Sequence, residues 1–178
     1  MRSQRTWLVV TVLMLVTWAG RVEAQPAAAG WQGFANAWIA SHAARLKGQA
    51  PKETRKSCEG DVNGDAHSDV VVIYTIERVG EGGGGNPSTQ YAVVLTSAPQ
   101  GYGATMPKEV GSNGARSVEG CTVSGTTVEL ALKTWSPKDA ACCPTVPGKA
   151  SLTFAKGALS DSPGTASSAS PAPVPSAK

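Results

Sequence analysis

An aspartate-rich stretch at residues 61–72, DVNGDAHSDVVV, carries the side chains best suited to chemistry in this sequence. Its polar residues fall at every other position, namely Asp61, Asn63, Asp65, His67 and Asp69. A hard cation such as calcium takes six to eight oxygen ligands, and a short loop can supply them from alternate side chains. We therefore predict a calcium site whose ligands are the Asp and Asn side chains and the backbone carbonyl of His67.

The same residues resemble the calcium loop of FG-GAP and VCBS repeats, whose pattern is D-x-[DN]-x-D-G-x-x-D-[LV]. These repeats occur in integrin-type propellers and in many secreted bacterial proteins. The resemblance implies ligand roles for the side chains that match the pattern, which are Asp61, Asn63, Asp65 and Asp69. It covers residues 61–72 and does not extend to the propeller fold, because a propeller needs several copies and this chain has one.

Two residues of the stretch depart from known calcium loops. Val72 stands at position twelve, where an EF-hand has a bidentate acid, and this argues against an EF-hand. Ala66 stands where the resembling loops have glycine, and an alanine forced to a positive φ costs about 1 kcal/mol. The alternative interpretation of the stretch is a polar turn that caps the following strand through Asx hydrogen bonds.

The cysteines form the second reactive group: Cys58, Cys121, Cys142 and Cys143. In an oxidising compartment an even number of cysteines predicts disulfides, and four cysteines allow three pairings. A bond between Cys142 and Cys143 closes a strained ring, so we expect each of these two to pair with one of the others. Zinc binding and redox chemistry are the alternatives, but both favour C-x-x-C spacings that these cysteines lack.

The sequence holds two histidines, His42 and His67, and neither lies in a recognisable nucleophile–base motif. Paired carboxylates can do acid–base chemistry, but those present cluster in one short loop at metal-ligand spacing. We therefore favour a protein without enzymatic activity, although distant residues can assemble an active site in a folded chain. His42 lies beside an apolar stripe, and we expect it at the surface or at the core boundary.

Both ends of the chain have the composition of segments outside the folded domain. Residues 1–24 combine a basic start, a 14-residue apolar run at 6–19 and small residues before position 25, which is the layout of a secretory signal peptide. The run is short for a membrane span, so a signal anchor is the less favoured alternative. Residues 161–178 are rich in Ser, Ala and Pro and predict a disordered tail. A single domain at 25–160 remains, in a periplasmic or secreted protein with no stable membrane insertion after signal removal.

Charge limits the class of partner. The formal net charge of +3 falls to +1 without residues 1–24, which hold three arginines and one glutamate. A near-neutral chain argues against a nucleic-acid partner. A local basic cluster is interrupted by Glu53 and consists of Arg45, Lys47, Lys52, Arg55 and Lys56. We interpret it as a solvated linker and not as an anion site.

One helix and several strands must position these residues. Apolar side chains recur at helical spacing over residues 31–47, and Gly48 is placed to end that helix. From residue 69 the period changes to two, and residues 69–78 are apolar on both faces, as in a central strand. Further strands are expected at 91–97, 116–123, 126–135 and 149–155, with a weaker one at 105–110. The predicted fold class is α+β, with an N-terminal helix packed on an antiparallel β-meander of five or six strands.

More loosely, the chain resembles a group of small exported bacterial proteins of unknown function. The shared features are an aspartate-rich loop, a Y-T-[IL]-E strand and a C-C-P motif, here Cys142, Cys143 and Pro144. We predict an exported binding module, stabilised by disulfides and calcium, whose partner is an unknown protein or envelope component. The alternatives are a hydrolase of envelope polymers and a periplasmic inhibitor of a hydrolase.

Overall fold

The computed structural model describes residues 30–78, 87–140 and 143–162. Within these residues the chain forms one α-helix, α1 (Trp31–Arg45), a short 3-10 helix, η1 (Lys52–Thr54), and nine strands. The strands are β1 (Lys56–Gly60), β2 (Asp69–Glu77), β3 (Ser88–Ala98), β4 (Gly101–Ala104), β5 (Lys108–Ser112), β6 (Arg116–Ser124), β7 (Thr127–Thr134), β8 (Val146–Ala155) and β9 (Ala158–Asp161).

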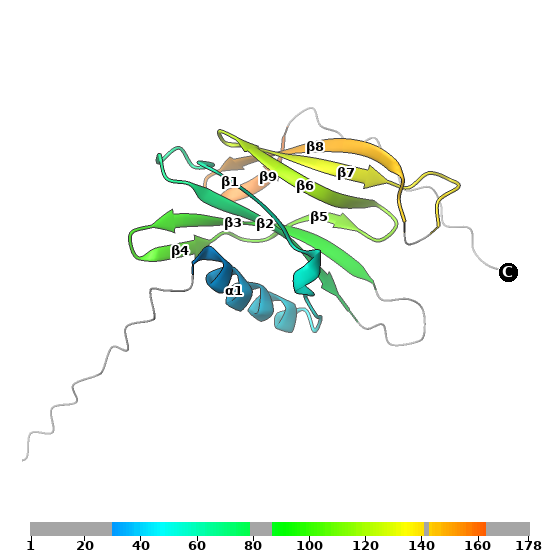
Figure 1. Ribbon diagram of the computed structural model, residues 1–178, viewed down its shortest axis with the longest axis horizontal. Coiled ribbons are helices and arrows are strands. Elements are labelled where there is room, and N and C mark those ends of the chain that lie inside the picture. The colour runs from blue at the N-terminus through cyan, green and yellow to red at the C-terminus, as the bar shows by residue number, and fades with distance from the viewer. Residues whose placement is uncertain (1–29, 79–86, 141–142, 163–178) are drawn as a thin grey trace, which may run out of the picture.

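All nine strands belong to one antiparallel sheet that folds back over itself. The strand order is β1-β2-β3-β5-β6-β7-β8-β9, and β4 pairs with the end of β3. β5 and β6 are paired at one position alone, Ser112 with Arg116, so the ladder is almost interrupted there. After this weak point β6, β7 and β8 lie across β2 and β3 as a second layer, with α1 on the opposite side (Figure 1).

This architecture corrects the predicted five- or six-stranded meander with a helix packed on it. The chain combines a helix with strands, as the coarse α+β class requires, but the described residues hold nine strands in a folded-back sheet. The sequence pattern gives the strands and not their fold-back, because a strand looks the same locally whether its inner face meets a helix or another part of the sheet.

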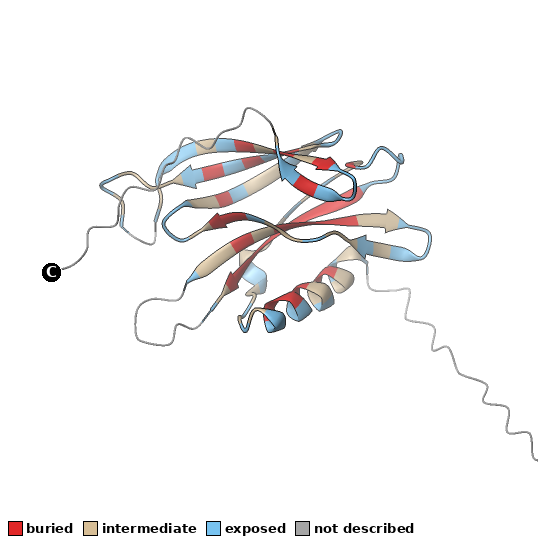
Figure 2. Ribbon diagram, turned by 180° about the vertical axis from the view of Figure 1, so that it is seen from behind, coloured by how far each residue is buried: buried red, intermediate tan, exposed pale blue. Residues whose placement is uncertain are grey.

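The fold-back creates two apolar cores, one on each face of β2 and β3. The larger lies between the two halves of the sheet and contains Val62, Val71, Ile73, Ala92, Val94, Val110, Val118, Val128, Leu130, Leu132, Ala150, Leu152, Phe154 and Leu159. The smaller lies beneath the helix and contains Ala35, Ile39, Ala43, Val70, Val72, Tyr74, Ile76, Val93 and Leu95. Figure 2 shows the buried residues concentrated along β2 and β3, between the two outer layers.

The prediction of a central strand from residue 69 is confirmed. Eight consecutive residues of β2 are buried, and alternate side chains enter the two different cores. Val71 and Ile73 face the second half of the sheet, whereas Val72 and Tyr74 face α1. A continuous run of β-branched residues suits a strand that is covered on both sides.

A buried glutamine joins the two halves of the sheet where backbone pairing fails. The side-chain oxygen of Gln90 accepts a hydrogen bond from the Val118 backbone N–H at 2.6 Å, and its amide nitrogen donates to the Val118 carbonyl at 3.3 Å. Register shifts occur in β3 at Gln90 and in β6 after Val118. The Gln90 side chain therefore takes the place of a neighbouring strand for Val118, whose polar groups would otherwise be buried without partners.

The predicted helix is also confirmed, with its end two residues earlier than the apolar pattern suggests. Lys47 adopts a left-handed conformation with φ 52°, and the Gly48 N–H donates to the Ala43 carbonyl at 2.9 Å, which closes the helix in a Schellman-type turn. A Cβ at Gly48 would lie 2.5 Å from the Ile76 side chain. Glycine is required at position 48 because the chain passes so close to β2.

His42 lies in the smaller core, so the expectation of a surface or boundary position is wrong. It is 7 % exposed, and its Nδ1 is 2.7 Å from the Tyr74 hydroxyl. The Tyr91 ring meets the imidazole edge-to-face, and Trp38 packs beside it. Burial, assisted by the positive charge of Arg45, lowers the pKa of His42 from 6.5. The histidine is therefore held neutral at pH 7, and its ring serves the packing of α1.

This setting predicts a pH-dependent stability. Below roughly pH 6.5 the unfolded chain binds a proton at His42 more readily than the folded chain does, so stability falls, at most by about 1.4 kcal/mol per pH unit, until the lowered folded-state pKa is reached. A His42→Asn variant places an amide near Nδ1 but does not titrate. Chemical unfolding from pH 7.5 to 5 should therefore show a shallower decline for His42→Asn, whereas exposed His67→Asn should follow the parent. If the free energy of unfolding fell equally with pH in all three proteins, His42 would not be the source of the pH dependence.

The ends of the chain fall largely outside the described residues. The predicted signal peptide at 1–24 and residues 163–178 of the predicted tail belong to this part. Asp161, the first residue of that tail in the sequence-based division, pairs with Leu152 as the last residue of β9. Among the helices of the described segments, none has the length and apolar character needed to cross a bilayer.

Candidate binding site

The aspartate-rich loop connects β1 to β2 and is organised around Asp61. One carboxylate oxygen accepts the backbone N–H of Gly64 at 2.7 Å and that of Asp65 at 3.1 Å, while the other accepts the Ala66 N–H at 2.8 Å. These hydrogen bonds, that from Ala66 above all, lower the pKa of Asp61. The chain can wrap this carboxylate because Gly64 and Ala66 both have left-handed backbones, with φ 81° and 66°.

In the middle of the loop, side-chain oxygens likewise accept backbone N–H groups, here from residues two positions later. The Asn63 side-chain oxygen accepts the Asp65 N–H at 2.9 Å, and Asp65 accepts the His67 N–H at 2.8 Å. The Asn63 amide also donates to the second Asp65 oxygen at 2.8 Å. His67 thus takes part in the loop through its backbone N–H, whereas the sequence suggested its carbonyl.

Asp69 is separated from the other acidic side chains by its orientation. It is 0 % exposed, and its two oxygens accept the Val62 N–H at 3.2 Å and the Ser97 N–H at 3.0 Å. The carboxylate therefore ties the loop and the start of β2 to the far end of β3. This is a bridge between backbone segments, and the loop side chains Asn63 and Asp65 are exposed to solvent.

The oxygens that calcium would need already bind other groups of the loop and of β3. The side-chain oxygens of Asp61, Asn63, Asp65 and Asp69 each accept a hydrogen bond from an N–H group. Their negative charge is thus offset by oriented amides, as the polar-turn interpretation requires. Across the described segments, no group of three or more His, Cys, Asp or Glu side chains is arranged to hold a metal. The hydrogen bonds favour the turn, and calcium binding stays a prediction.

Ala66 does occupy a backbone conformation that favours glycine. Its φ of 66° makes Ala66→Gly a stabilising change, expected to raise the free energy of unfolding by about 0.5 to 1 kcal/mol. Urea unfolding of the two proteins measures this difference. Ala44→Gly is the matched control: this exposed alanine lies in α1, where glycine should lower stability by about 1 kcal/mol. Equal losses in the two variants would contradict the assignment of strain at position 66.

The cysteines pair differently from the sequence-based expectation. A disulfide joins Cys58 on β1 to Cys121 on β6, so the expected bonds from these two to the Cys-Cys pair are wrong. Cys143 is also disulfide-bonded, and Cys142 lies outside the described residues. Cys58 pairs in register with Val71, whose side chain faces the larger core, and this places its sulfur opposite β6. The disulfide therefore connects the two halves of the folded-back sheet.

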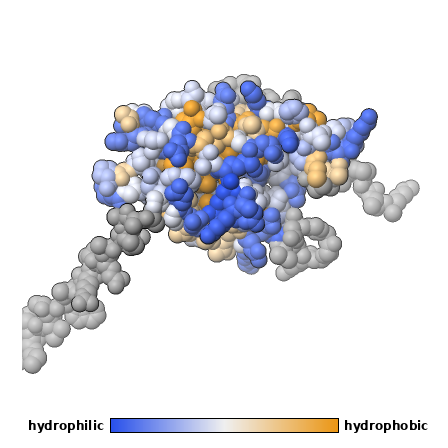
Figure 3. Space-filling view, viewed as in Figure 1, coloured by the Kyte–Doolittle hydropathy of each residue, from blue (hydrophilic) through white to orange (hydrophobic). Residues whose placement is uncertain are grey.

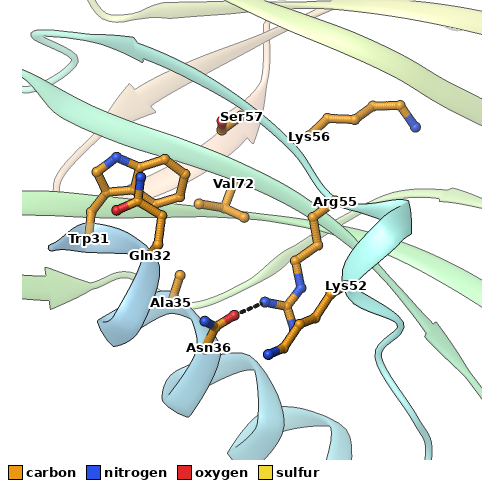
Figure 4. Close-up of a pocket in the computed structure, with 9 residues that line it drawn as sticks. All are labelled: Trp31, Gln32, Ala35, Asn36, Lys52, Arg55, Lys56, Ser57 and Val72. Atoms are coloured by element: carbon orange, nitrogen blue, oxygen red, sulfur yellow. Dashed lines mark hydrogen bonds between the residues drawn. The ribbon is translucent and has the colours of Figure 1, made fainter. Parts of the chain in front are cut away.

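A pocket of about 230 Å³ lies between α1, η1 and β1, with β2 as its floor. It is lined by Trp31, Gln32, Ala35, Asn36, Lys52, Arg55, Lys56, Ser57 and Val72. Figure 4 shows the Trp31 ring and the Gln32 amide at one end of the pocket, with Arg55, Lys52 and Asn36 converging at the other. The Lys56 side chain is directed away from the helix. We refer to this cavity as the Arg55 pocket.

Arg55 is the electrostatic centre of the pocket. Its Nη1 donates to the Asn36 side-chain oxygen and its Nη2 to the Ala50 carbonyl at 3.5 Å, while the buried Nε has no hydrogen-bond partner. Burial lowers the pKa of Arg55, and the neighbouring Glu53 opposes this effect. The guanidinium remains charged at pH 7, because an arginine side chain does not lose its proton in proteins.

In the described part of the chain no carboxylate forms an ion pair with the cations of the pocket, although Glu53 lies close enough to Arg55 to affect its pKa. In the segments that the structure describes, the ion pair found is Lys108 with Asp161, on β5 and β9, and neither Arg55 nor Lys52 is in one. The first turn of α1, which borders the pocket, also carries no acidic residue. On the face shown in Figure 3, hydrophilic side chains gather over η1 and the adjoining part of β1.

The interpretation of the basic cluster as a solvated linker therefore fails for Arg55. Arg45, the last residue of α1, and Lys47 just after it are exposed, but Arg55 turns inward and bonds to Asn36 on the helix. The two residues are 19 positions apart, and no local pattern connects them. The alternation of side chains along β1 could have located this pocket. Ser57 is paired with Val72 and lies on the strand face that is turned toward α1, whereas Lys56 lies on the other face.

A wider depression of about 530 Å³ lies beside the aspartate-rich loop. Its polar wall includes Asp65, Thr96 and Lys156. It combines an acid and an amine from separate loops, and so has no consistent preference for one charge. The Arg55 pocket has such a preference.

Comparison with known protein families, with curated proteins and with solved structures finds no match to this chain. The candidate site therefore rests on the geometry described above.

Proposed function

We propose that the protein is an exported, non-enzymatic binding domain whose ligand enters the Arg55 pocket. The observation that carries this proposal is a preformed cavity that combines a desolvated guanidinium, a tryptophan and an apolar floor. Small-molecule sites have this character, with a largely apolar lining and a few fixed polar groups. The Cys58–Cys121 disulfide supports export, because such bonds persist in oxidising compartments.

The settings of the two histidines favour binding over catalysis. His42 is buried and bonded to Tyr74, and the His67 backbone takes part in a turn. The envelope-hydrolase alternative needs an acid and a base around a reacting atom, and neither histidine lines the Arg55 pocket. The inhibitor alternative needs a docking surface, and 79 %-exposed Met106 is its best element. Val146, 42 % exposed, is the other large apolar residue exposed in the described segments, and scattered exposed apolar residues are normal for a surface.

Native mass spectrometry of the mature protein tests the proposed function. The protein is incubated with the small-molecule fraction of an envelope extract, and bound species are then identified. A parent-specific ligand should be lost in Ser57→Trp, because Ser57 is an exposed residue at the pocket rim and an indole there would fill the cavity. Lys133→Trp, at an exposed position on β7 outside the pocket lining, is the matched control. Recovery of a chemically converted ligand would support the hydrolase, and equal binding by Ser57→Trp would exclude this pocket.

Calcium has a structural role in this proposal. Asp61, Asn63 and Asp65 would supply side-chain oxygens to the ion, and the loop would be fixed between β1 and β2. At a calcium concentration 100 times the dissociation constant, the folded state gains about 2.7 kcal/mol. Thermal unfolding with calcium and with a chelator measures this gain, and Asp65→Ala should abolish it. An unchanged midpoint in millimolar calcium would leave the loop as a polar turn stabilised by its own amides.

A further inference from the structure

We propose that the Arg55 pocket recognises a small apolar carboxylate, the chemistry of an acylated amino acid or of the last residue of a peptide. The inference rests on the proposed function, since it names the ligand class for the same cavity. It follows from the charge of the pocket, from the shape of the charged group and from the lining and size of the cavity.

The charge requires an anion. Arg55 is partly buried, its Nε has no acceptor, and Lys52 enters the cavity from η1 beside it. A partly buried cation that forms no ion pair loses hydration, and a bound anion compensates for this loss more fully than the neighbouring Glu53 does. The ligand therefore brings a negative group to the end of the pocket where Arg55, Lys52 and Asn36 converge (Figure 4).

The number of donors favours a carboxylate over a phosphate. One guanidinium, already bonded to Asn36 and Ala50, has few N–H groups left for a ligand, and these suit the two oxygens of a carboxylate. A phosphate has a larger charge and three acceptor oxygens to satisfy. Glu53, close enough to Arg55 to raise its pKa, disfavours the larger negative charge.

The rest of the cavity describes the body of the ligand. Ala35 and Val72 form an apolar floor, and the Trp31 ring stands at the end opposite Arg55. The Gln32 amide lies beside that ring and can bond to an amide group of the ligand. The volume of about 230 Å³ is below the range of drug-sized sites. These features fit a ligand that consists of one apolar amino acid with an acylated nitrogen and a free carboxylate.

Calorimetric titration of the mature protein with matched probes tests the ligand class. N-acetyl-leucine should bind, whereas its amide, with the same apolar body and no charge, should bind about tenfold to hundredfold more weakly. A phosphonate analogue tests the second anion, and a tripeptide ending in leucine shows whether the pocket accepts a peptide terminus. Tighter binding of the phosphonate, or equal binding of the amide, would overturn the carboxylate assignment.

Substitutions in the pocket and an NMR measurement test whether the probe binds in the Arg55 pocket. Arg55→Gln should weaken N-acetyl-leucine about tenfold to hundredfold, and Arg55→Lys should recover only part of the loss because the planar fork is missing. Lys133→Gln removes an equal charge from an exposed position on β7, which does not line the pocket, and should bind like the parent. In the nitrogen–proton spectrum the Trp31 indole signal should shift on titration, while that of Trp135, which donates to Ala140, should not.

The outcomes separate this inference from the proposed function. A shift of the Trp31 signal with equal binding of the amide, or with tighter binding of the phosphonate, would keep the pocket as a binding site and reject the carboxylate. If no probe shifts Trp31 and the extract yields no species lost in Ser57→Trp, both fail. Because loss of Arg55 can also affect folding, each variant must retain the parent spectrum outside the pocket before its affinity is compared.

Discussion

A double variant, Cys58→Ala with Cys121→Ala, is expected to lose about 4 kcal/mol of unfolding free energy. The bond spans a sequence separation of 63 residues, so it removes much conformational freedom from the unfolded chain. It also joins β1 to β6, in the two halves of the sheet. Urea unfolding of the oxidised proteins measures the loss.

The geometry of the fold-back explains why this cross-link should matter. The two halves are connected along the sheet by β5, whose pairing with β6 is limited to Ser112 and Arg116. The Gln90 side chain adds two hydrogen bonds to Val118, and the remaining adhesion is apolar contact in the larger core. The disulfide is thus a strong connection across a boundary with little backbone pairing.

The control for this prediction is Cys142→Ala with Cys143→Ala. This variant removes the other two cysteines and leaves the β1–β6 bond intact, so it should retain most of the stability. A reducing agent should destabilise the control variant strongly, because it breaks the β1–β6 bond, and should affect the Cys58 and Cys121 variant less, because only the disulfide of Cys143 remains there. A loss below about 1 kcal/mol in the latter would show that apolar packing alone holds the sheet halves together.

Elements defined by local patterns were predicted well from the sequence. The change of apolar spacing from helical to alternating locates α1 and β2, and β2 is buried on both faces as its continuous apolar run indicates. The strands expected at 116–123 and 126–135 correspond to β6 and β7. In each case a side-chain period along one segment carries the information.

The fold-back depended on information that no single segment contains. The sheet bends where β5 and β6 share a single residue pair. At this bend the buried Gln90 side chain forms the hydrogen bonds to Val118 that a neighbouring strand would otherwise form. The disulfide was mispredicted for the same reason. Because Cys142 and Cys143 are adjacent, we expected each of them to bond to one of the other two cysteines, but Cys58 and Cys121 bond to each other once the sheet has folded back. Such contacts can be predicted only when the pairing of strands far apart in the sequence is known.

The candidate sites divide in the same way. The loop geometry follows from local residues, since Asp61 bonds to amides three to five positions later and Ala66 adopts the positive φ foreseen for its position. Asp139 acts in a similar way: it accepts hydrogen bonds from Ser136 and Thr145, and these bonds lower its pKa to about 2. The Arg55 pocket needed tertiary structure, because it forms only when α1 covers β2.

Asp69→Ala is expected to lower the free energy of unfolding by about 3 kcal/mol in calcium-free buffer. The substitution leaves the Val62 and Ser97 N–H groups without their acceptor, and an unsatisfied buried donor costs about 1 to 3 kcal/mol. Asp69→Asn keeps one acceptor oxygen and should lose about half as much. Urea unfolding in the presence of a chelator measures the losses.

The comparison with Asp65→Ala decides which role Asp69 has. Asp65 is exposed and bonds within the loop, so its removal should cost less than about 1 kcal/mol without calcium. If Asp69 were mainly a calcium ligand, both variants would resemble the parent in a chelator and differ from it only when calcium is added. A large loss for Asp69→Ala in both conditions would instead identify the buried carboxylate as a bridge between the loop and β3, on which any calcium site in that loop depends.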